Sequence, residues 1–258
     1  MLFRRHSGLS VDARSALAAL LRAPTFELIP LKNSMDQAAG FRAVPHLSAR
    51  MIRDRAHLRD LIAWLEGVGA DRAFVVGGDA KEPGEFLDGL SLLRAMAEIG
   101  HQLTEIGVPC YPQGHPFIPD AALLEALRAK AAFASYMTTQ LCFDPAAIRT
   151  WLDARRAEGI ELPVHLGLPG VAEPHRLLAI TARIGVADTH RFLSKNARFV
   201  ARLVRSGGFY RPDGLLDGLG PIAADPAAAI VDFHVYTFNN VGPTEDWRRR
   251  YLERLGRA

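Results

Sequence analysis

Short apolar runs alternate with longer amphipathic stretches along the chain. The short runs are rich in β-branched and aromatic residues, which is typical of strands. Because strands and helices alternate strictly, the sheet is expected to be parallel. The sequence predicts seven strands, at 26–30, 44–48, 73–78, 108–112, 134–143, 163–169 and 232–238.

The longer stretches carry apolar residues at spacings of three and four, which predicts helices. Several begin at Asp or Pro and end at Gly, as capped helices do. The stretch 205–226 is rich in Gly, Pro and Asp, so we expect an irregular connection there. The predicted helices lie at 55–69, 86–100, 120–132, 144–159 and 173–185, with a further one at 10–23 and a basic, solvated one at 245–258.

This order of elements leaves two α/β architectures, a closed barrel and a doubly wound sheet. No Gly-rich dinucleotide fingerprint follows the first strand, and polar residues recur at the carboxyl ends of many strands. Both observations favour the barrel. The sequence therefore predicts a single TIM-type (β/α) barrel domain over 1–258, reduced to seven recognisable strands and preceded by an N-terminal helix.

Composition narrows the class of protein. With 258 residues, 49% of them hydrophobic, the chain can bury one large core. The net charge of +3 comes from 31 basic and 28 acidic residues without a concentrated basic patch, so no nucleic-acid partner is expected. No apolar stretch reaches the length of a membrane span. Cys110 and Cys142 lie in apolar runs and are expected to be buried free thiols, which fits a soluble cytoplasmic protein.

Polar residues gather where the predicted strands end, the place where barrel enzymes carry their chemistry. Asp144 precedes Pro145, and a helix N-cap explains it without a further role. Glu27 stands among apolar neighbours, and a buried carboxylate of this kind suits a general acid. The whole set consists of Glu27, His46, Asp79, Tyr111, His115, Gln140, Asp144 and the segment 236–240.

Six stretches carry a family resemblance when they are taken together and in order. They are "FELIP" (26–30), "AVPHLS" (43–48), "VVGGD" (75–79), "YPQGHP" (111–116), "TTQLCFD" (138–144) and "DFHVYTFNN" (232–240). In these stretches the chain resembles the flavin-dependent methylenetetrahydrofolate reductases. The resemblance extends over most of the chain, from about residue 26 to 239.

The resemblance implies that NAD(P)H reduces bound FAD, which then reduces 5,10-methylenetetrahydrofolate to 5-methyltetrahydrofolate, or the reverse oxidation in one-carbon metabolism. It implies two catalytic residues: Glu27, which protonates N10 of the folate, and Asp79, which lies near the flavin and the pterin and also binds the substrate. Gln140 would hold the amide-like edge of the pterin. The residues implied for the FAD site are His46, Gly78, Tyr111, His115, Lys130 and Tyr236.

The chain departs from the family pattern mostly on the cofactor side. About one β/α unit is missing between the first predicted strand and residue 43. Gly77, Gln113, Leu123 and Asn240 stand where the family has Arg, Glu, Asp and Arg. Two alternatives therefore stay open, a folate reductase that works without flavin and a non-catalytic folate-binding subunit. The choice between NADH and NADPH and the formation of a homo-oligomer stay open as well.

A metal-dependent barrel enzyme is a more remote alternative. Histidines lie on or just after strands, and Asp79 could complete a metal site with them. No His-x-His or His-Glu-x-x-His pair occurs, so no metal is expected. The histidines concerned are His46, His115, His165 and His234.

Overall fold

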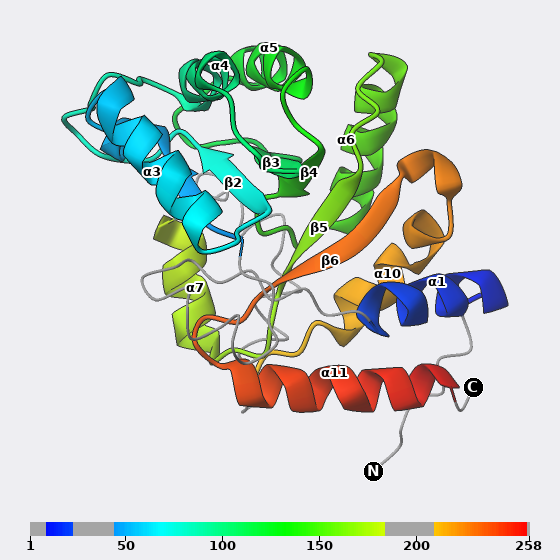
Figure 1. Cartoon of the computed structure of the whole chain (residues 1–258). Coiled ribbons are helices and arrows are strands. Elements are labelled where there is room, and N and C mark those ends of the chain that lie inside the picture. Colours follow the sequence, from blue (N-terminus) through cyan, green and yellow to red (C-terminus); the bar gives the residue numbers. More distant parts are fainter. Residues whose placement is uncertain (1–8, 23–43, 184–208, 257–258) are drawn as a thin grey trace. The chain divides into compact units, whose positions relative to one another are not determined.

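The computed structural model describes residues 9–22, 44–183 and 209–256. Six strands alternate with helices along these residues, so the fold is α/β (Figure 1). They correspond to six of the seven predicted strands; the seventh, at 26–30, lies outside the described residues. The chain divides into two compact units, unit 1 with 1–23, 111–120 and 139–258, and unit 2 with 24–110 and 121–138. The single barrel domain stays a prediction.

Unit 2 contains strands in the order β1-β2-β3-β4. β1 pairs with β2 in parallel, with His46 opposite Phe74, and β2 pairs with β3 in parallel, with Arg72 opposite Glu105. The guanidinium of Arg72 lies 2.6 Å from the Glu105 carboxylate across this pair. The strands are β1 (His46–Ser48), β2 (Arg72–Val76), β3 (Glu105–Cys110) and β4 (Tyr136–Thr139), of which the last residue belongs to unit 1.

Two helices of unit 2, α3 (Arg55–Gly67) and α4 (Gly89–Ile99), confirm the predicted amphipathic pattern. Each of the two buries a stripe of apolar side chains and begins at an aspartate cap, whereas α5 (Asp120–Ala131) buries Leu127 alone. Asp54 accepts a hydrogen bond from the backbone N–H of His57, and Asp88 forms a capping box with Ser91. The elements are the 3₁₀ turn η1 (Ala49–Met51), α3 (Arg55–Gly67), α4 (Gly89–Ile99) and α5 (Asp120–Ala131).

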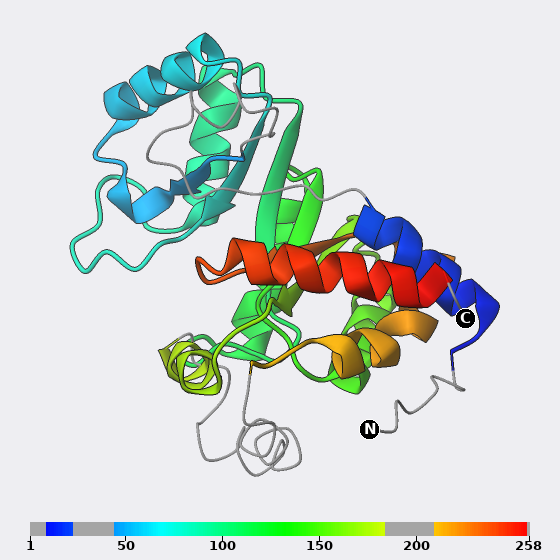
Figure 2. The same cartoon turned by 90° about the horizontal axis from the view of Figure 1, so that it is seen from below.

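Unit 1 is built on a parallel pair of strands, β5 (Val164–Pro169) and β6 (Ile230–Tyr236). Helix α1 packs beside α10 and α11, as both views show (Figures 1 and 2). Arg248 of α11 donates a hydrogen bond to the carbonyl of Leu21 in α1, which joins the two terminal helices. The helical elements are α1 (Val11–Arg22), α6 (Pro145–Ala157), α7 (Pro174–Arg183), α10 (Asp213–Ala223), η2 (Pro226–Ala228) and α11 (Val241–Gly256).

Helix α10 corrects the expectation of an irregular connection over 205–226. Its apolar residues Leu215, Leu216, Leu219 and Ile222 are buried. Burial of each such side chain contributes about 1.5–3 kcal/mol, more than the roughly 1 kcal/mol that each glycine costs a helix. The glycines also allow close packing, because a Cβ on Gly220 would lie 2.7 Å from the Leu9 side chain. Tertiary packing therefore overrides local propensity here.

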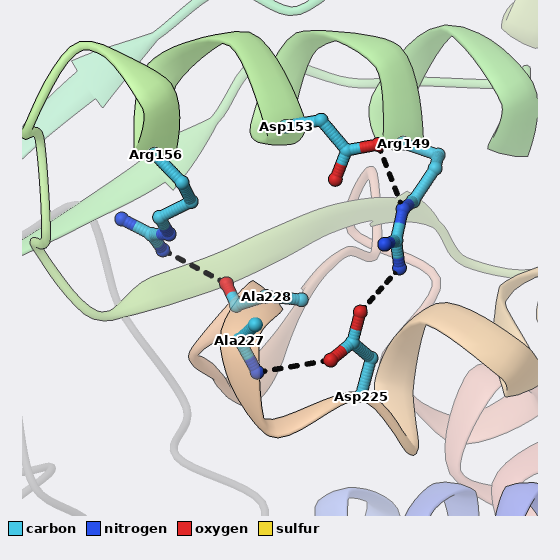
Figure 3. A network of polar contacts seen from close by, with 6 residues as sticks. All are labelled: Arg149, Asp153, Arg156, Asp225, Ala227 and Ala228. Carbon is cyan, nitrogen blue, oxygen red and sulfur yellow. Dashed lines mark hydrogen bonds and ion pairs between the residues drawn. The ribbon is translucent and has the colours of Figure 1, made fainter.

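Ion pairs join α6 to the turn η2 (Figure 3). Arg149 contacts the Asp153 carboxylate at 3.0 Å and the Asp225 carboxylate at 2.6 Å. Asp225 also caps η2 by accepting the backbone N–H of Ala227. Arg156 donates to the Ala228 carbonyl at 2.8 Å. These contacts fix the chain just before β6, the strand that carries Tyr236.

Two further expectations bear on the class of protein. Cys110 and Cys142 are buried, and neither of these two residues is in a disulfide, as predicted. Among the helices that the structure describes, no member has the length and apolar character needed to cross a membrane.

Candidate functional site

His46 is the first residue of β1 and is half-buried. Its ring centroid lies 4.8 Å from that of Phe74, its neighbour on β2, with the ring planes tilted by 39°. Phe74 packs in turn with Val44 and Tyr136 in a hydrophobic cluster of unit 2. His46 therefore lies two residues before the end of its strand and borders an aromatic core.

Gly78 and Asp79 follow β2 in a loop that reaches from residue 77 to the start of α4. Gly78 has a φ of 87°, and a Cβ at this position would lie 2.0 Å from Oγ of Ser48. Both the backbone conformation and the close approach to Ser48 therefore require glycine. Asp79 comes next and is exposed, so its carboxylate is accessible to a ligand.

The Asp79 loop, residues 77–88, is bonded to the segment after β1. The backbone N–H of Arg50 donates to Gly77 at 3.0 Å, and the N–H of Gly84 donates to the Arg50 carbonyl at 3.0 Å. The N–H of Glu85 donates to the Arg53 carbonyl at 2.9 Å. Sequence reasoning missed Arg50, because no local pattern marks an arginine that contacts a loop some 30 residues away.

Lys130 lies on α5 and is half-buried. Burial lowers the pKa of its amine, and Cys110 and Asp88 act in the opposite direction. The side chain is therefore not the fully solvated surface lysine that its place on a helix would also allow. A role as a phosphate partner stays a prediction.

Gln140 directly follows β4 in unit 1. Its side-chain Oε1 accepts the backbone N–H of Leu141 at 3.2 Å, and its carbonyl accepts the thiol of Cys142 at 3.0 Å. Its Nε2 donates no hydrogen bond to any residue that the structure describes. Because the Leu141 N–H needs an acceptor, the carboxamide is oriented with its two N–H groups available to a ligand.

The thiol of Cys142 is not a candidate nucleophile. Burial raises its pKa to about 12, although a hydrogen bond with Thr139 acts in the opposite direction. A thiol with such a pKa stays protonated at neutral pH, and the thiolate is the reactive form. The Cys142 side chain therefore supports the turn that carries Gln140.

Tyr111 and His115 come together in the loop after β3. The N–H of Gly114 donates to the Tyr111 carbonyl at 3.0 Å, and the two rings meet edge to face at 5.2 Å. Nδ1 of His115 accepts the N–H of Phe117 at 3.3 Å. Burial lowers the pKa of His115, so the neutral imidazole with a proton on Nε2 is favoured. His115 thus has a donor for a ligand.

Tyr236 ends β6 and packs in a core cluster of unit 1. Its hydroxyl donates to the Thr139 carbonyl at 3.2 Å, and its ring lies 4.5 Å from that of His234. The close approach needs glycine on β5, because a Cβ on Gly167 would lie 2.3 Å from the Thr139 carbonyl oxygen. Tyr236 therefore links β6 to the end of β4 through its hydroxyl.

A strained turn follows Tyr236. Phe238 and Asn239 have φ values of 52° and 62°, which non-glycine residues seldom adopt. The turn is held by Asn240, whose side chain donates to the Val171 carbonyl at 2.8 Å, and by Arg176, which donates to the Phe238 carbonyl at 3.4 Å. Sequence reasoning placed Asn240 in the candidate segment 236–240 and as a departure from the family pattern, but gave it no specific role.

The structure thus groups the predicted residues within each unit. Unit 2 contains His46, Gly78, Asp79 and Lys130, and unit 1 contains Tyr111, His115, Gln140 and Tyr236. Glu27, the predicted acid, lies outside the described residues. Within the described ranges, no group of three His, Cys, Asp or Glu residues could hold a metal ion.

A family model described as methylenetetrahydrofolate reductase matches residues 28–186, more than half of the chain. The match begins one residue after Glu27 and ends before β6, which carries Tyr236. The other predicted site residues lie inside it. The family has a TIM-barrel fold, in which strands alternate with helices as they do here. The chain belongs to the methylenetetrahydrofolate reductase family.

Proposed function

We propose that the protein reduces 5,10-methylenetetrahydrofolate to 5-methyltetrahydrofolate with NAD(P)H through bound FAD, or runs the reverse oxidation in one-carbon metabolism. Family membership supports a folate-related oxidoreductase role. The observation that carries the finer proposal is that Asp79 and Gln140 lie inside the family match and present groups suited to a pterin.

The chemistry needs a proton and a hydride. A proton on N10 opens the five-membered ring of the folate to an iminium, and Glu27 is the proposed donor. Its apolar neighbours in "FELIP" favour the protonated form of a carboxyl group. FAD, when bound and reduced by NAD(P)H, would supply the hydride that the methylene carbon accepts.

Gln140 and Asp79 are the proposed folate-binding residues. The Nε2 group of Gln140 would donate to an acceptor on the pterin, since its Oε1 already accepts the Leu141 N–H. The exposed carboxylate of Asp79 would accept from an N–H group of the pterin or of the flavin. Both roles orient the substrate without requiring proton transfer by these two residues.

The proposed FAD residues differ in what they can offer. The Lys130 amine and the Nε2–H of His115 are donors of the kind that phosphate and ribityl oxygens accept. Tyr111 offers an aromatic ring. The hydroxyl of Tyr236 is engaged by Thr139, and Ser48 leaves no room for a side chain on Gly78, so these two residues would limit the shape of a site. Each of these groups is, by its own chemistry, of a kind that a dinucleotide cofactor can use.

A flavin-independent folate enzyme or a folate-binding subunit is the second candidate. At two positions where the chain differs from the family on the cofactor side, the side chain is hydrogen-bonded to the protein backbone. This favours the second candidate. Gln113 accepts the N–H of Phe143 at 3.1 Å, and Asn240 donates to the Val171 carbonyl. These side chains are occupied by the protein backbone, whereas the family has charged residues at both positions.

The first test is the visible absorption spectrum of the full chain, before and after incubation with FAD and removal of the excess. A retained flavin spectrum that bleaches with NADH or NADPH is expected. Turnover of methylenetetrahydrofolate without retained flavin would favour the second candidate. Folate affinity without turnover would leave only a binding role.

Glu27→Gln tests the proposed acid. The variant should keep folate affinity and lose most of the reduction of methylenetetrahydrofolate, about 100-fold or more, because general acid catalysis contributes on that order. Glu161→Gln, at an exposed carboxylate just before β5, is the matched control. A fully active Glu27→Gln enzyme would rule out the assigned role.

A further inference from the structure

We propose that Arg50 is a positioning residue, whose guanidinium fixes the Asp79 loop and thereby the place of the Asp79 carboxylate. The loop contacts are independent of the protein's function, and the catalytic consequence rests on the proposed function. Nothing in the family resemblance assigns this role to position 50.

The guanidinium of Arg50 donates to three carbonyls of the Asp79 loop. Nε lies 2.7 Å from the Ala80 oxygen, and one terminal nitrogen lies 3.2 Å from the Lys81 oxygen. The other terminal nitrogen lies 3.5 Å from the Leu87 oxygen. One side chain therefore connects the first part of the loop, next to Asp79, with its end before α4.

This connection depends on the shape of an arginine. A guanidinium has five N–H donors in a fixed plane, so it can serve several separated acceptors at once. A lysine amine offers its donors from a single atom. Within the described ranges Arg50 makes no ion pair, so the loop carbonyls are the partners of its charge.

Arg50 is itself held in place by the segment that it belongs to. It lies in η1, its N–H donates to Gly77, and its carbonyl accepts the N–H of Gly84. Gly84 packs closely against this segment, because a Cβ there would lie 2.0 Å from the Ile52 carbonyl oxygen. The guanidinium therefore extends from a fixed backbone to the loop.

Asp79 lies between two of these fixed points. The residue before it, Gly78, approaches Ser48, and the residue after it, Ala80, gives its carbonyl to Arg50. The Asp79 side chain is short and exposed, so the backbone of the loop limits the region that its carboxylate can reach. Binding groups that must meet a substrate accurately need this kind of support from the residues behind them.

The experiment compares Arg50→Ala and Arg50→Lys in the full chain with the control Arg53→Ala. Arg53 is exposed, and its side chain contacts no loop carbonyl. For each variant we would measure kcat and KM for methylenetetrahydrofolate and the amide hydrogen exchange of residues 79–87. The kinetic measurements are repeated in an Asp79→Asn background, which completes a double-mutant cycle.

Arg50→Ala should lower kcat/KM by about 10- to 100-fold, as expected for a misplaced catalytic-site group. Arg50→Lys should recover only part of the loss, and Arg53→Ala should match the wild type. Exchange over 79–87 should be faster in Arg50→Ala. In an Asp79→Asn background, Arg50→Ala should cost little more, because both changes disable the same group.

Two results would overturn the inference. The first is an unchanged kcat/KM for Arg50→Ala, and the second is a loss that simply adds to that of Asp79→Asn. If the wild-type chain reduces no folate, the proposed function fails by itself. Exchange then decides the loop contact: unchanged exchange over 79–87 in a folded Arg50→Ala variant would show that Arg50 does not fix the loop.

Discussion

Asp79 of unit 2 and Gln140 of unit 1 both follow a parallel strand, but they are held in different ways. Asp79 is exposed, and its loop is fixed by Arg50, by the close approach of Gly78 to the Ser48 side chain and by that of Gly84 to the Ile52 backbone. Gln140 is half-buried, and its own Oε1 accepts the N–H of Leu141. The first residue depends on distant parts of the chain and the second on its immediate neighbour, so substitutions should affect them differently.

Gly78→Ala should have the largest effect, because it disturbs the Asp79 loop directly. The added Cβ would clash with Ser48, and alanine is strained at a φ of 87°. We expect a loss of about 2 kcal/mol or more in the free energy of unfolding. The expected loss in kcat/KM is about 100-fold. Denaturant titration and steady-state kinetics measure the two effects.

Gly69→Ala is the matched control for this substitution. Gly69 has a φ of 70°, but a Cβ there would meet no atom within 4 Å. The control should therefore show only the backbone cost, about 1–2 kcal/mol, and keep full activity. Equal behaviour of the two variants would contradict the importance of the contact between Gly78 and Ser48.

Gln140→Glu should have the next largest effect, and mainly on binding. The carboxylate still accepts the Leu141 N–H, so the free energy of unfolding should change by less than about 1 kcal/mol. It lacks the N–H donors, so the Kd for folate should rise about 10-fold or more. Calorimetric titration with tetrahydrofolate measures this, with Gln102→Glu, at an exposed glutamine, as control. Unchanged affinity would exclude the donor role.

His115 should give a smaller, pH-dependent effect. Its pKa is lowered by burial, so the folded state binds its proton less readily than the unfolded state does. Stability should therefore fall as the pH drops below the ordinary histidine value near 6.5, and the loss should be complete below the folded pKa. His115→Gln should flatten this part of the profile of unfolding free energy against pH. The exposed His175→Gln serves as control.

The smallest effect is expected at Cys142, whose thiol should not react with a thiol reagent in the native protein. Its pKa of about 12 and its burial keep the thiol protonated and inaccessible at pH 8. Mass spectrometry should locate a label on Cys142 only after denaturant is added. Rapid labelling of the native protein would show that the turn after β4 opens, and that Gln140 is less firmly placed than the structure indicates.

Much of the fold could be predicted from the sequence. The periods of apolar residues predicted β2, β5, α3 and α6 to within a few residues, because these signals are local. The same reasoning failed at α10, where glycines and a proline hid a helix that is stabilised by its buried leucines. The prediction relied on the Gly, Pro and Asp content of 205–226, whereas the stability of α10 depends on which of its side chains face the core.

The candidate site was predictable to a smaller extent. Asp79, Gln140 and His115 were found because they stand in short motifs after strands. Arg50 was not found, because its three acceptors lie about 30 residues away and are backbone atoms that any sequence would supply. The positive φ of Phe238 also left no signal, since phenylalanine rarely adopts it, whereas asparagine, as at Asn239, is one of the residue types that do.

The sequence by itself determined the alternation of strands and helices and the family to which the chain belongs, because both are written in local patterns and ordered motifs. Only the tertiary structure decided which atoms of those motifs remain available to a ligand. Gln140 has its N–H groups available and Tyr236 has its hydroxyl occupied, since their partners, Leu141 and Thr139, are known only once the chain is folded. A sequence motif identifies one group of a hydrogen bond, but its partner is decided by the tertiary structure, which brings the two groups together.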